Sequence, residues 1–323
     1  MSLSSGHDPR RVTVRAPAKI NLHLGVGAPR PDGFHPLATV YQAVGLYDDV
    51  TVSTWDDWSV QVNLEGVLVD PGTAREASGP VPLDHDNIAV QAGHALLAHH
   101  GLRDLAAAIT IHKSIPVAGG MAGGSADAAA TLVALDRLWD LQTTDEDLLA
   151  IAAGLGSDVP FALLGGTALG TGRGELVEPV ADAGSWWWVV VGSDTGLSTP
   201  EVYRAFDRMH DPVSLAEPVR PPELFLALAG GEPDALAAQL VNDLQEPALG
   251  LRPDLRRTFE DGLAAGALAG LLSGSGPTVL MLCADGDHAR EVTGRLHEAG
   301  HARVLAVPAP VSGAHVVSYD GGL

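Results

Sequence analysis

Polar and hydrophobic residues alternate along Arg11–Val26, the first long stretch of the chain with a regular pattern. A period of two residues is typical of a β-strand that turns one face towards a core. The alternation gives a polar face with Lys19, Asn21 and His23, and an apolar face with Ile20, Leu22 and Leu24. A lysine that faces inward costs free energy unless an acidic group pairs with it. We therefore expect a carboxylate from elsewhere in the chain beside Lys19.

The rest of the first half is predicted to contain further strands and helices. Strands are expected over residues 39–46, 49–54 and 107–117, and helices over residues 86–101, 125–141 and 143–156. The last of these helices has a threonine cap, an acidic first turn and a glycine stop, which are ordinary signals of helix ends. Two segments rich in proline, glycine and aspartate, 27–37 and 66–86, are predicted to be loops.

The second half has a different order of elements. Strands are predicted over residues 185–193, 267–272, 278–283 and 303–308, and helices over residues 199–209, 222–229, 234–241, 253–265 and 287–299. The strand–strand–helix–strand order at the end resembles part of a ferredoxin-like split unit. A chain of 323 residues is long for one core. We expect two domains, residues 1–180 and 181–323, with a final strand that can return to the first domain.

Composition narrows the classes of function. The formal net charge of −21 argues against nucleic acid or an anionic membrane as the main partner. The longest apolar run, Trp186–Val191, is far shorter than a membrane span, and the N-terminus lacks the apolar region of a secretory signal. The single cysteine, Cys283, fits a reducing compartment. We expect a cytoplasmic protein that is a monomer or a weak homodimer.

A glycine cluster precedes the predicted helix at 125–141. Gly119, Gly120, Gly123 and Gly124 stand just before Ser125, which would serve as a helix cap. The segment lacks the Lys-Ser/Thr of a Walker A loop and the spacing of a dinucleotide fingerprint. A tight turn would need only one or two glycines, whereas a loop that approaches an anion closely needs more. Unpaired amides at a helix N-terminus suit phosphate, so we expect an anion-binding loop.

Asp158 is a second candidate for chemistry. It follows a helix stop in the segment GSDVPF, where a turn can direct a carboxylate into a cleft. Pro160 would suit an early helical position, which makes Asp158 equally fit to cap a short helix. The residues alone leave the catalytic and the capping interpretation open.

Three motifs, in this order along the chain, resemble those of the GHMP small-molecule kinases. They are APAKINLHLGV at 16–26, PVAGGMAGGSADAA at 116–129 and LLSGSGPTVLML at 271–282. Ala118 departs from the pattern, because the family often has glycine there. The resemblance implies an α+β fold with an N-terminal ribosomal-S5-like domain, a C-terminal ferredoxin-like domain and an active site between them. It also implies ATP as substrate.

The resemblance assigns roles to individual residues. Asp158 would be the base for the acceptor hydroxyl, and Lys19 would keep its carboxylate charged. The residues implied around ATP are Asn87 and Lys113 near the adenine, and Pro116, Gly119, Gly120, Gly123, Gly124 and Ser125 around the triphosphate. Mg²⁺ is implied as the companion of ATP, with Ser125 as a protein ligand.

The acceptor is implied by further segments. The loop PDGFHPL and the segment GSDVPF are similar to those of family members that phosphorylate the 2-hydroxyl of a CDP-linked methylerythritol in non-mevalonate isoprenoid synthesis. By this resemblance Asn21, Phe34, His35 and Tyr203 bind the substrate. Two alternatives remain at this point: a kinase of the same fold for mevalonate or homoserine, and a nucleotide-binding sensor without activity.

Overall fold

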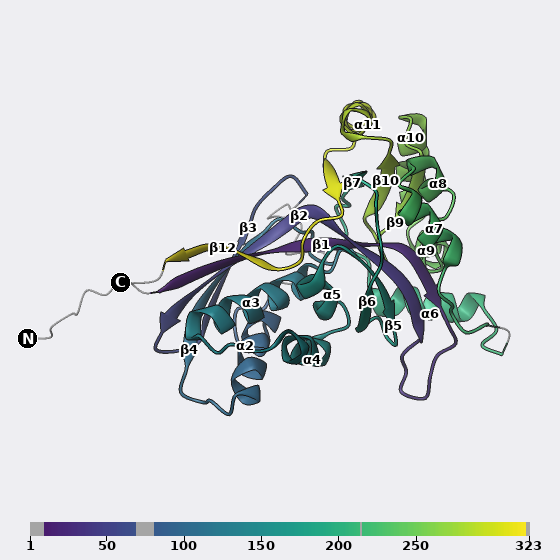
Figure 1. Cartoon of the computed structure of the whole chain (residues 1–323). Coiled ribbons are helices and arrows are strands. Elements are labelled where there is room, and N and C mark those ends of the chain that lie inside the picture. The colour runs from purple at the N-terminus through teal and green to yellow at the C-terminus, as the bar shows by residue number, and fades with distance from the viewer. Residues whose placement is uncertain (1–9, 69–80, 214, 321–323) are drawn as a thin grey trace, which may run out of the picture.

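The computed structural model describes residues 10–68, 81–213 and 215–320. They form two β-sheets with helices on their outer faces (Figure 1). The main path of the larger sheet has the order β12-β1-β2-β4-β3. These strands are β1 (Arg11–Val26), β2 (Leu37–Trp55), β3 (Ser59–Leu64), β4 (Ala106–Lys113) and β12 (His315–Asp320). Strand β12 pairs antiparallel with β1, so the end of the chain returns to its first strand.

Short strands and helices complete the described part of this half. Strand β5 pairs with β2 and β6, and strand β8 pairs with β1. Helix α3 packs against both β1 and β2. The elements are α2 (Ile88–His99), α3 (Gly123–Trp139), α4 (Asp145–Leu155), α5 (Val159–Leu164), β5 (Thr167–Thr171), β6 (Leu176–Pro179) and β8 (Val241–Asn242).

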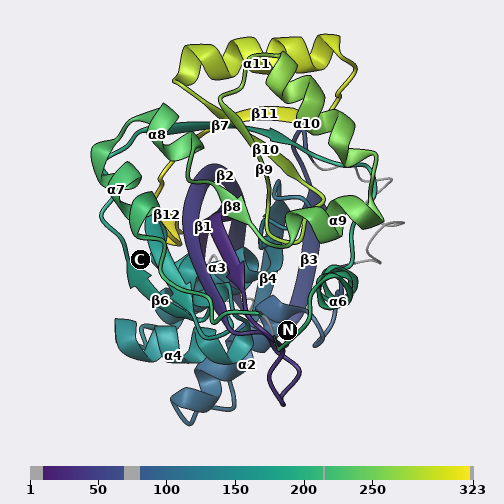
Figure 2. The same cartoon turned by 90° about the vertical axis from the view of Figure 1, so that its right-hand side faces the viewer.

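The smaller sheet has the antiparallel order β11-β7-β10-β9. Its strands are β7 (Trp186–Val191), β9 (Ala269–Leu272), β10 (Val279–Cys283) and β11 (Val304–Ala309). The helices of this half are α6 (Thr199–Met209), α7 (Pro222–Gly230), α8 (Pro233–Ala237), α9 (Gln245–Leu251), α10 (Leu255–Ala264) and α11 (Gly286–Glu298). Figure 2 shows α10 and α11 on the outer side of this sheet. The strand order and the crossing helices confirm the expected ferredoxin-like arrangement.

Strand β2 corrects one prediction from the sequence. Residues 39–46 and 49–54 were expected to form two strands, but they belong to one strand that runs from Leu37 to Trp55. The pairing with β1 shifts where Pro17 lies opposite Tyr47 and Ala18 lies opposite Val44. A bulge of this kind absorbs extra residues without ending the strand. The break between the two predicted strands therefore corresponds to a bulge.

Strand β1 has a second irregularity, which changes the predicted faces. Its register with β2 shifts between Asn21 and His23. Strict alternation placed His23 beside Lys19 and Asn21, but Leu24 lines the same cavity as these two residues and His23 does not. The expectation for His23 was wrong because one extra residue in a strand reverses the faces beyond it.

Several helix boundaries also differ. Helix α3 starts at Gly123, and Ala122, whose side chain cannot cap, takes the position expected for Ser125. A helix was predicted over residues 234–241, but α8 ends at Ala237 and Val241 belongs to the strand β8. The pattern did not predict α9 or the strands β3, β5, β6 and β8, which have two to seven residues each. Strand β12 pairs with β1, where a final strand was expected to return. The predicted loop at 66–86 lies largely outside the described residues.

Strand β1 joins the two halves through the core. Ile20 and Leu22 belong to a hydrophobic cluster that includes α3 and part of the smaller sheet. Leu24 and Val26, a few residues further, belong to a second cluster in the C-terminal half. Among the described residues no helix is long and apolar enough to cross a membrane. Lys19 and Asn21, the polar residues of the site, alternate along β1 with Ile20 and Leu22 of the first cluster.

Candidate active site

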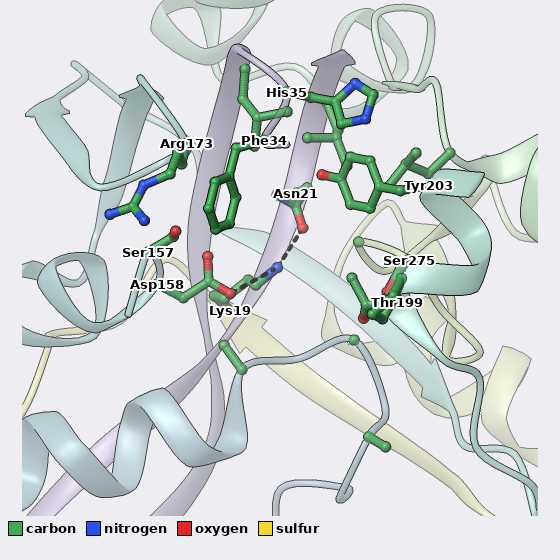
Figure 3. A pocket seen from close by; sticks show the side chains of 18 of the residues that line it. Lys19, Asn21, Phe34, His35, Ser157, Asp158, Arg173, Thr199, Tyr203 and Ser275 are labelled. Carbon is green, nitrogen blue, oxygen red and sulfur yellow. Dashed lines mark hydrogen bonds and ion pairs between the residues drawn. The ribbon is translucent and has the colours of Figure 1, made fainter. Parts of the chain in front are cut away.

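A cavity of about 700 Å³ lies where β1, the glycine loop, α5 and α6 meet (Figure 3). Most of the predicted site residues line it: Lys19, Asn21, Phe34, His35, Pro116, Gly119, Gly120, Gly123, Gly124, Asp158 and Tyr203. Three predicted residues do not line it: Asn87, Lys113 and Ser125. The fold thus brings together residues that are up to 256 positions apart in the chain, from Lys19 to Ser275.

Lys19 and Asp158 face each other across the base of the cavity. Lys19 Nζ donates a hydrogen bond of 2.7 Å to Asn21 Oδ1 and lies 3.6 Å from Asp158 Oδ2. The side chain of Lys19 is only 9% exposed, so the ammonium needs this carboxylate and this amide to offset its lost hydration. The acidic partner expected beside Lys19 is therefore Asp158.

Tyr41 holds the other oxygen of Asp158. The Tyr41 hydroxyl donates a hydrogen bond of 3.0 Å to Asp158 Oδ1. Burial of this side chain, together with the nearby charge of Asp158, raises the pKa of Tyr41 well above its ordinary value. Tyr41 consequently remains a neutral donor at any physiological pH, and it orients the carboxylate.

The geometry at α5 separates the two interpretations of Asp158. The residue occupies the N-cap position of α5, but its side chain makes no capping hydrogen bond. Its oxygens point instead to Tyr41 and Lys19, inside the cavity. A carboxylate with one oxygen oriented and the other beside an ammonium is suited to accept a proton from a bound alcohol.

The glycine loop lies beside this pair. Ala118, Gly120 and Ala122 all have positive φ, at 52°, 78° and 58°. Helix α3 then begins at Gly123 without a side-chain cap, so its first amides are free to bind an anion. Two alanines in the left-handed region, where glycine is favoured, show that the loop is held in shape by its surroundings.

The second glycine turn supports the loop. Ser273 Oγ donates a hydrogen bond of 3.1 Å to the carbonyl oxygen of Gly120. A Cβ added at Gly120 would lie 2.1 Å from the carbonyl oxygen of Ser273, which leaves no room for any other residue. The hydroxyls of Thr199 and Ser275 are 2.7 Å apart and join α6 to the same turn. The two glycine motifs therefore form one structure.

Asn87 and Lys113 have partners of their own within the protein. Asn87 caps α2: its Oδ1 accepts a hydrogen bond of 2.9 Å from the amide of Ala89. Lys113 Nζ lies 2.6 Å from Asp48 Oδ2 and 2.8 Å from Asp127 Oδ2, and all three side chains are buried. The resemblance placed both residues near adenine, but in this structure their polar atoms are turned to these protein groups.

The Lys113 cluster (Lys113, Asp48 and Asp127) joins the two ends of the glycine loop. Asp48 Oδ1 accepts hydrogen bonds from the amides of Ser114 and Ile115, at 2.7 and 2.9 Å, where the loop begins. Asp127 lies in α3, where the loop has ended. Burial lowers the pKa of Lys113, but the two carboxylates outweigh it and hold the pKa above its ordinary value. Lys113 is therefore a fixed cation beneath the loop.

Aromatic rings line the other end of the cavity. Phe34 and Tyr203 lie on opposite sides of it in Figure 3, with His35 next to Tyr203. The rings of His35 and Tyr203 have centroids 5.0 Å apart and an interplanar angle of 33°. Phe34 is 51% exposed, so one ring face remains open to a ligand. Burial raises the pKa of Tyr203 above its ordinary value, and its hydroxyl stays neutral.

Some residues of the site were not predicted from the sequence. They are Tyr41, Ser157, Arg173, Thr199, Arg204, Asp207 and Ser275. The guanidinium carbon of Arg173 lies 5.0 Å from the centroid of the Phe34 ring. Ser275 could have been predicted from the sequence, because it lies in the motif LLSGSGPTVLML. Arg173 lies in the glycine-rich segment GTGRGE, which was a weaker indication in the sequence of a residue at the site.

Comparisons with known proteins show the family of this chain. Residues 87–166 match the model of the GHMP kinases N terminal domain, and residues 226–302 match that of the GHMP kinases C terminal domain. A 4-diphosphocytidyl-2-C-methyl-D-erythritol kinase of Nocardioides sp. is 62% identical over 306 residues, which are 95% of this chain and 100% of the relative. A protein of the same name from Streptomyces avermitilis is 51% identical over 95% of this chain and 99% of the relative.

Solved structures show the same likeness. A crystal structure of 4-(cytidine 5'-diphospho)-2C-methyl-D-erythritol kinase has a TM-score of 0.72 and 31% identity, and covers 93% of this chain and 100% of that one. A homoserine kinase from Cytophaga hutchinsonii has a TM-score of 0.69 over 98% of this chain and 100% of that one, but at 17% identity it shows the fold alone.

Fold, cavity and family models together define the class: an ATP-dependent small-molecule kinase of the GHMP type. Within that class, the chain belongs to the 4-diphosphocytidyl-2-C-methyl-D-erythritol kinase family, whose members it matches over nearly its full length. The resemblance seen in the three motifs is confirmed.

Proposed function

We propose that this chain transfers the γ-phosphoryl group of ATP to the 2-hydroxyl of 4-diphosphocytidyl-2-C-methyl-D-erythritol, a step of non-mevalonate isoprenoid synthesis. The observation that carries the proposal is the position of Asp158. Its carboxylate is oriented by Tyr41, lies beside Lys19 and shares a cavity with the glycine loop. The names of the closely similar relatives supply the acceptor.

Asp158 and Lys19 have complementary roles in the chemical step. The acceptor hydroxyl gives its proton to Asp158, and its oxygen attacks the γ-phosphorus while the bond to the β-phosphate oxygen breaks and ADP leaves. Lys19 stabilises the negative charge that develops on the attacking oxygen. Asn21 accepts a hydrogen bond from Lys19 and so directs the ammonium towards the cavity.

The glycine loop and the start of α3 are proposed to bind the phosphates of ATP. Gly119, Gly120, Gly123 and Gly124 line the cavity, and the start of the helix adds partial positive charge. Mg²⁺, bound with the triphosphate, would neutralise its charge. Ser125, in the first turn of α3, does not line the cavity, so the phosphate oxygens would supply most of the oxygen ligands that Mg²⁺ prefers.

The aromatic end of the cavity is proposed to bind the cytidine group. Phe34 and Tyr203 offer two ring faces between which a base can stack. Arg173 and Arg204 also line the cavity and supply positive charge for a diphosphate, in a protein whose net charge is −21. A mevalonate or homoserine acceptor would leave these rings and guanidinium groups without a ligand.

An ADP-release assay with a panel of acceptors tests the proposal. The panel contains the CDP-linked alcohol, mevalonate and homoserine, each with ATP and Mg²⁺. We expect turnover with the CDP-linked alcohol and none above background with the others. Turnover with mevalonate or homoserine alone would favour the first alternative, and ATP binding without any turnover would favour a sensor.

Location and assembly remain predictions. We propose that the enzyme acts in the cytoplasm as a monomer or a weak homodimer. Sedimentation velocity across a range of protein concentrations tests the second point, since a weak dimer dissociates on dilution and a tight one does not.

A further inference from the structure

The segment between β6 and β7 connects the larger sheet to the smaller one, and it carries an acidic residue, Asp182, that the mechanism above does not use. Asp182 Oδ1 accepts hydrogen bonds from Trp186 Nε1 and from the amide of Gly184, at 2.8 and 3.0 Å. Asp182 Oδ2 accepts hydrogen bonds from Gln42 Nε2 and Thr167 Oγ1, at 2.9 and 2.6 Å. A carboxylate has about four acceptor positions, so this one is fully used.

The donors of this network come from both sheets. Gln42 on β2 and Thr167 on β5 lie opposite each other in the larger sheet, whereas Trp186 is the first residue of β7 in the smaller sheet. A second bond joins the same strands, because Trp188 Nε1 donates to Gln42 Oε1 at 3.1 Å. Apolar packing has no preferred direction, but a hydrogen bond weakens steeply when it bends. The network therefore favours a single orientation of the smaller sheet on the larger one.

Gln42 lies directly behind a residue of the site. Its neighbour on β2, Tyr41, lines the cavity and orients Asp158. Successive side chains of a strand point to opposite faces of a sheet, so Gln42 points away from the cavity, towards Trp188 of the smaller sheet. The larger sheet thus has the proposed chemistry on one face and the contact with the smaller sheet on the other.

The smaller sheet in turn positions one wall of the cavity. Strand β7 leads into α6, which brings Thr199 and Tyr203 to the cavity. Strand β10 pairs with β7 and follows the turn that contains Gly274 and Ser275, which line the same cavity. The glycine loop and Asp158 belong to the other half of the chain. A change in the angle between the sheets would therefore move the two walls relative to each other.

We propose that Asp182 is a positioning residue for phosphoryl transfer, which holds the smaller sheet, and with it α6, at one distance from the glycine loop. The inference rests on the proposed function, because it concerns where the acceptor lies relative to ATP. Transfer needs the acceptor oxygen in line with the γ-phosphorus, and a misplacement of about 1 Å caused far from the chemistry can cost about 100-fold in rate. Asp182 acts on the rate through the orientation of the sheets and touches neither substrate.

A distance between the two halves tests the structural part of the proposal. Ala150→Cys on α4 and Glu298→Cys on α11 place a spin label at one exposed site of each half, and Cys283 is buried. Pulsed electron spin resonance then measures the distribution of distances between the labels. In Asp182→Asn the NH₂ group must face two of the four donors. We expect the distribution to broaden or to shift from that of the parent.

Turnover tests the functional part. In the ADP-release assay with the CDP-linked acceptor, we expect kcat of folded Asp182→Asn to fall about 10–100-fold. KM for ATP should change little, because the loop proposed to bind the phosphates lies in the N-terminal half. Asp136→Asn is the matched control, since Asp136 Oδ1 accepts hydrogen bonds from the amide of Thr143, at 2.9 Å, and from its hydroxyl, within one half. It should keep the parental distances and kcat.

A reversed pair distinguishes orientation from a general loss of stability. Gln42→Glu combined with Asp182→Asn exchanges the carboxylate and the amide between the two positions. The carboxylate then accepts from Trp188 and from the new amide, whose oxygen accepts from Trp186. We expect the distances and kcat to return towards those of the parent, as coupled positions in a double-mutant cycle do. A reversed pair that keeps the values of Asp182→Asn would contradict the proposal.

The other outcomes separate this inference from the proposed function. Folded Asp182→Asn with parental distances, or with parental kcat, overturns the positioning role, while turnover by the parent still supports the kinase. A parent without turnover of the CDP-linked acceptor overturns the proposed function, and the inference with it. If Asp182→Asn does not fold, Gln42→Leu removes the bonds from β2 and leaves the carboxylate its other donors. Parental distances and kcat in that variant would overturn the inference.

Discussion

The two lysines of the chain, Lys19 and Lys113, are both buried and both paired with aspartate, yet their surroundings differ. Lys113 is in contact with two carboxylates at 2.6 and 2.8 Å and does not reach the cavity. Lys19 has an amide oxygen at 2.7 Å and a single carboxylate at 3.6 Å, and it lines the cavity. A fully paired cation contributes to structure, whereas a partly paired one can respond to charge that appears during a reaction. The predictions below use this contrast.

The largest expected effect is on the chemical step, in Asp158→Asn. The amide keeps the shape and the hydrogen bond from Tyr41 but cannot accept the proton of the acceptor. We expect kcat to fall about 10²–10⁴-fold in the folded protein, with both KM values near those of the parent. Single-turnover rates and thermal unfolding on the same samples measure this. Parental turnover in a folded variant would exclude Asp158 as the base.

The next effect is on stability, in Lys113→Met. The change leaves Asp48 and Asp127 buried together without a cation, and loss of one partner of a buried ion pair costs about 3–5 kcal/mol. Urea unfolding should show this loss in the free energy of unfolding. Lys19→Met is the matched comparison, because it should lose much of kcat and considerably less stability. Equal losses of stability in the two variants would contradict the contrast between the two lysines.

A smaller effect on ATP binding is expected from Gly124→Val. A Cβ at Gly124 meets only Ile88, at 3.9 Å, so the fold tolerates a side chain that then projects along the cavity. We expect KM for ATP to rise about 10-fold or more, on the order of 1.4 kcal/mol. Gly123 is unsuitable, since a Cβ there would lie 3.1 Å from both Ile115 and Lys113. Gly154→Val, in open space on α4, is the control and should leave KM unchanged.

The smallest effect is expected from Ala118→Gly. Ala118 has φ of 52°, and the left-handed region costs a residue with a Cβ about 1–2 kcal/mol. Glycine removes this strain but adds entropy to the unfolded chain, so a net gain of about 0.5 kcal/mol in the free energy of unfolding is expected. Ala150→Gly, exposed on α4, should instead lose about 1 kcal/mol. A loss of stability in both variants would show that the loop is unstrained at Ala118.

Sequence analysis predicted features that depend on neighbouring residues better than features that depend on contacts between distant parts of the chain. The bounds of Arg11–Val26 and Thr199–Met209 were predicted as the structure has them, because period and capping are local signals. The bulges of β1 and the continuity of β2 depend on strand pairing, which a periodic pattern cannot show. The glycine loop at 119–124 was found from its own residues, whereas the catalytic role of Asp158 came from the resemblance to the GHMP kinases.

The missed residues have partners that are distant in the chain. Tyr41 is 117 residues from Asp158, and the sequence around either residue does not predict their hydrogen bond. Lys113 illustrates the same limit, since its contacts with Asp48 and Asp127 come from folding and were not visible in the strand pattern. Ser125 was expected as a cap, but the left-handed backbone of Ala122 starts the helix two residues earlier than the side-chain signal indicates.

Strand β1 contributes Ile20 and Leu22 to one hydrophobic cluster and Leu24 and Val26 to the other. A chimaera that exchanges the C-terminal half for that of a distant kinase would therefore have to match side chains that remain on the N-terminal half. For the same reason the two halves should melt together, as one calorimetric transition whose measured enthalpy equals the van't Hoff enthalpy. Recombination between distant relatives is thus constrained by four side chains of a single strand, far more than by the loops that join the halves.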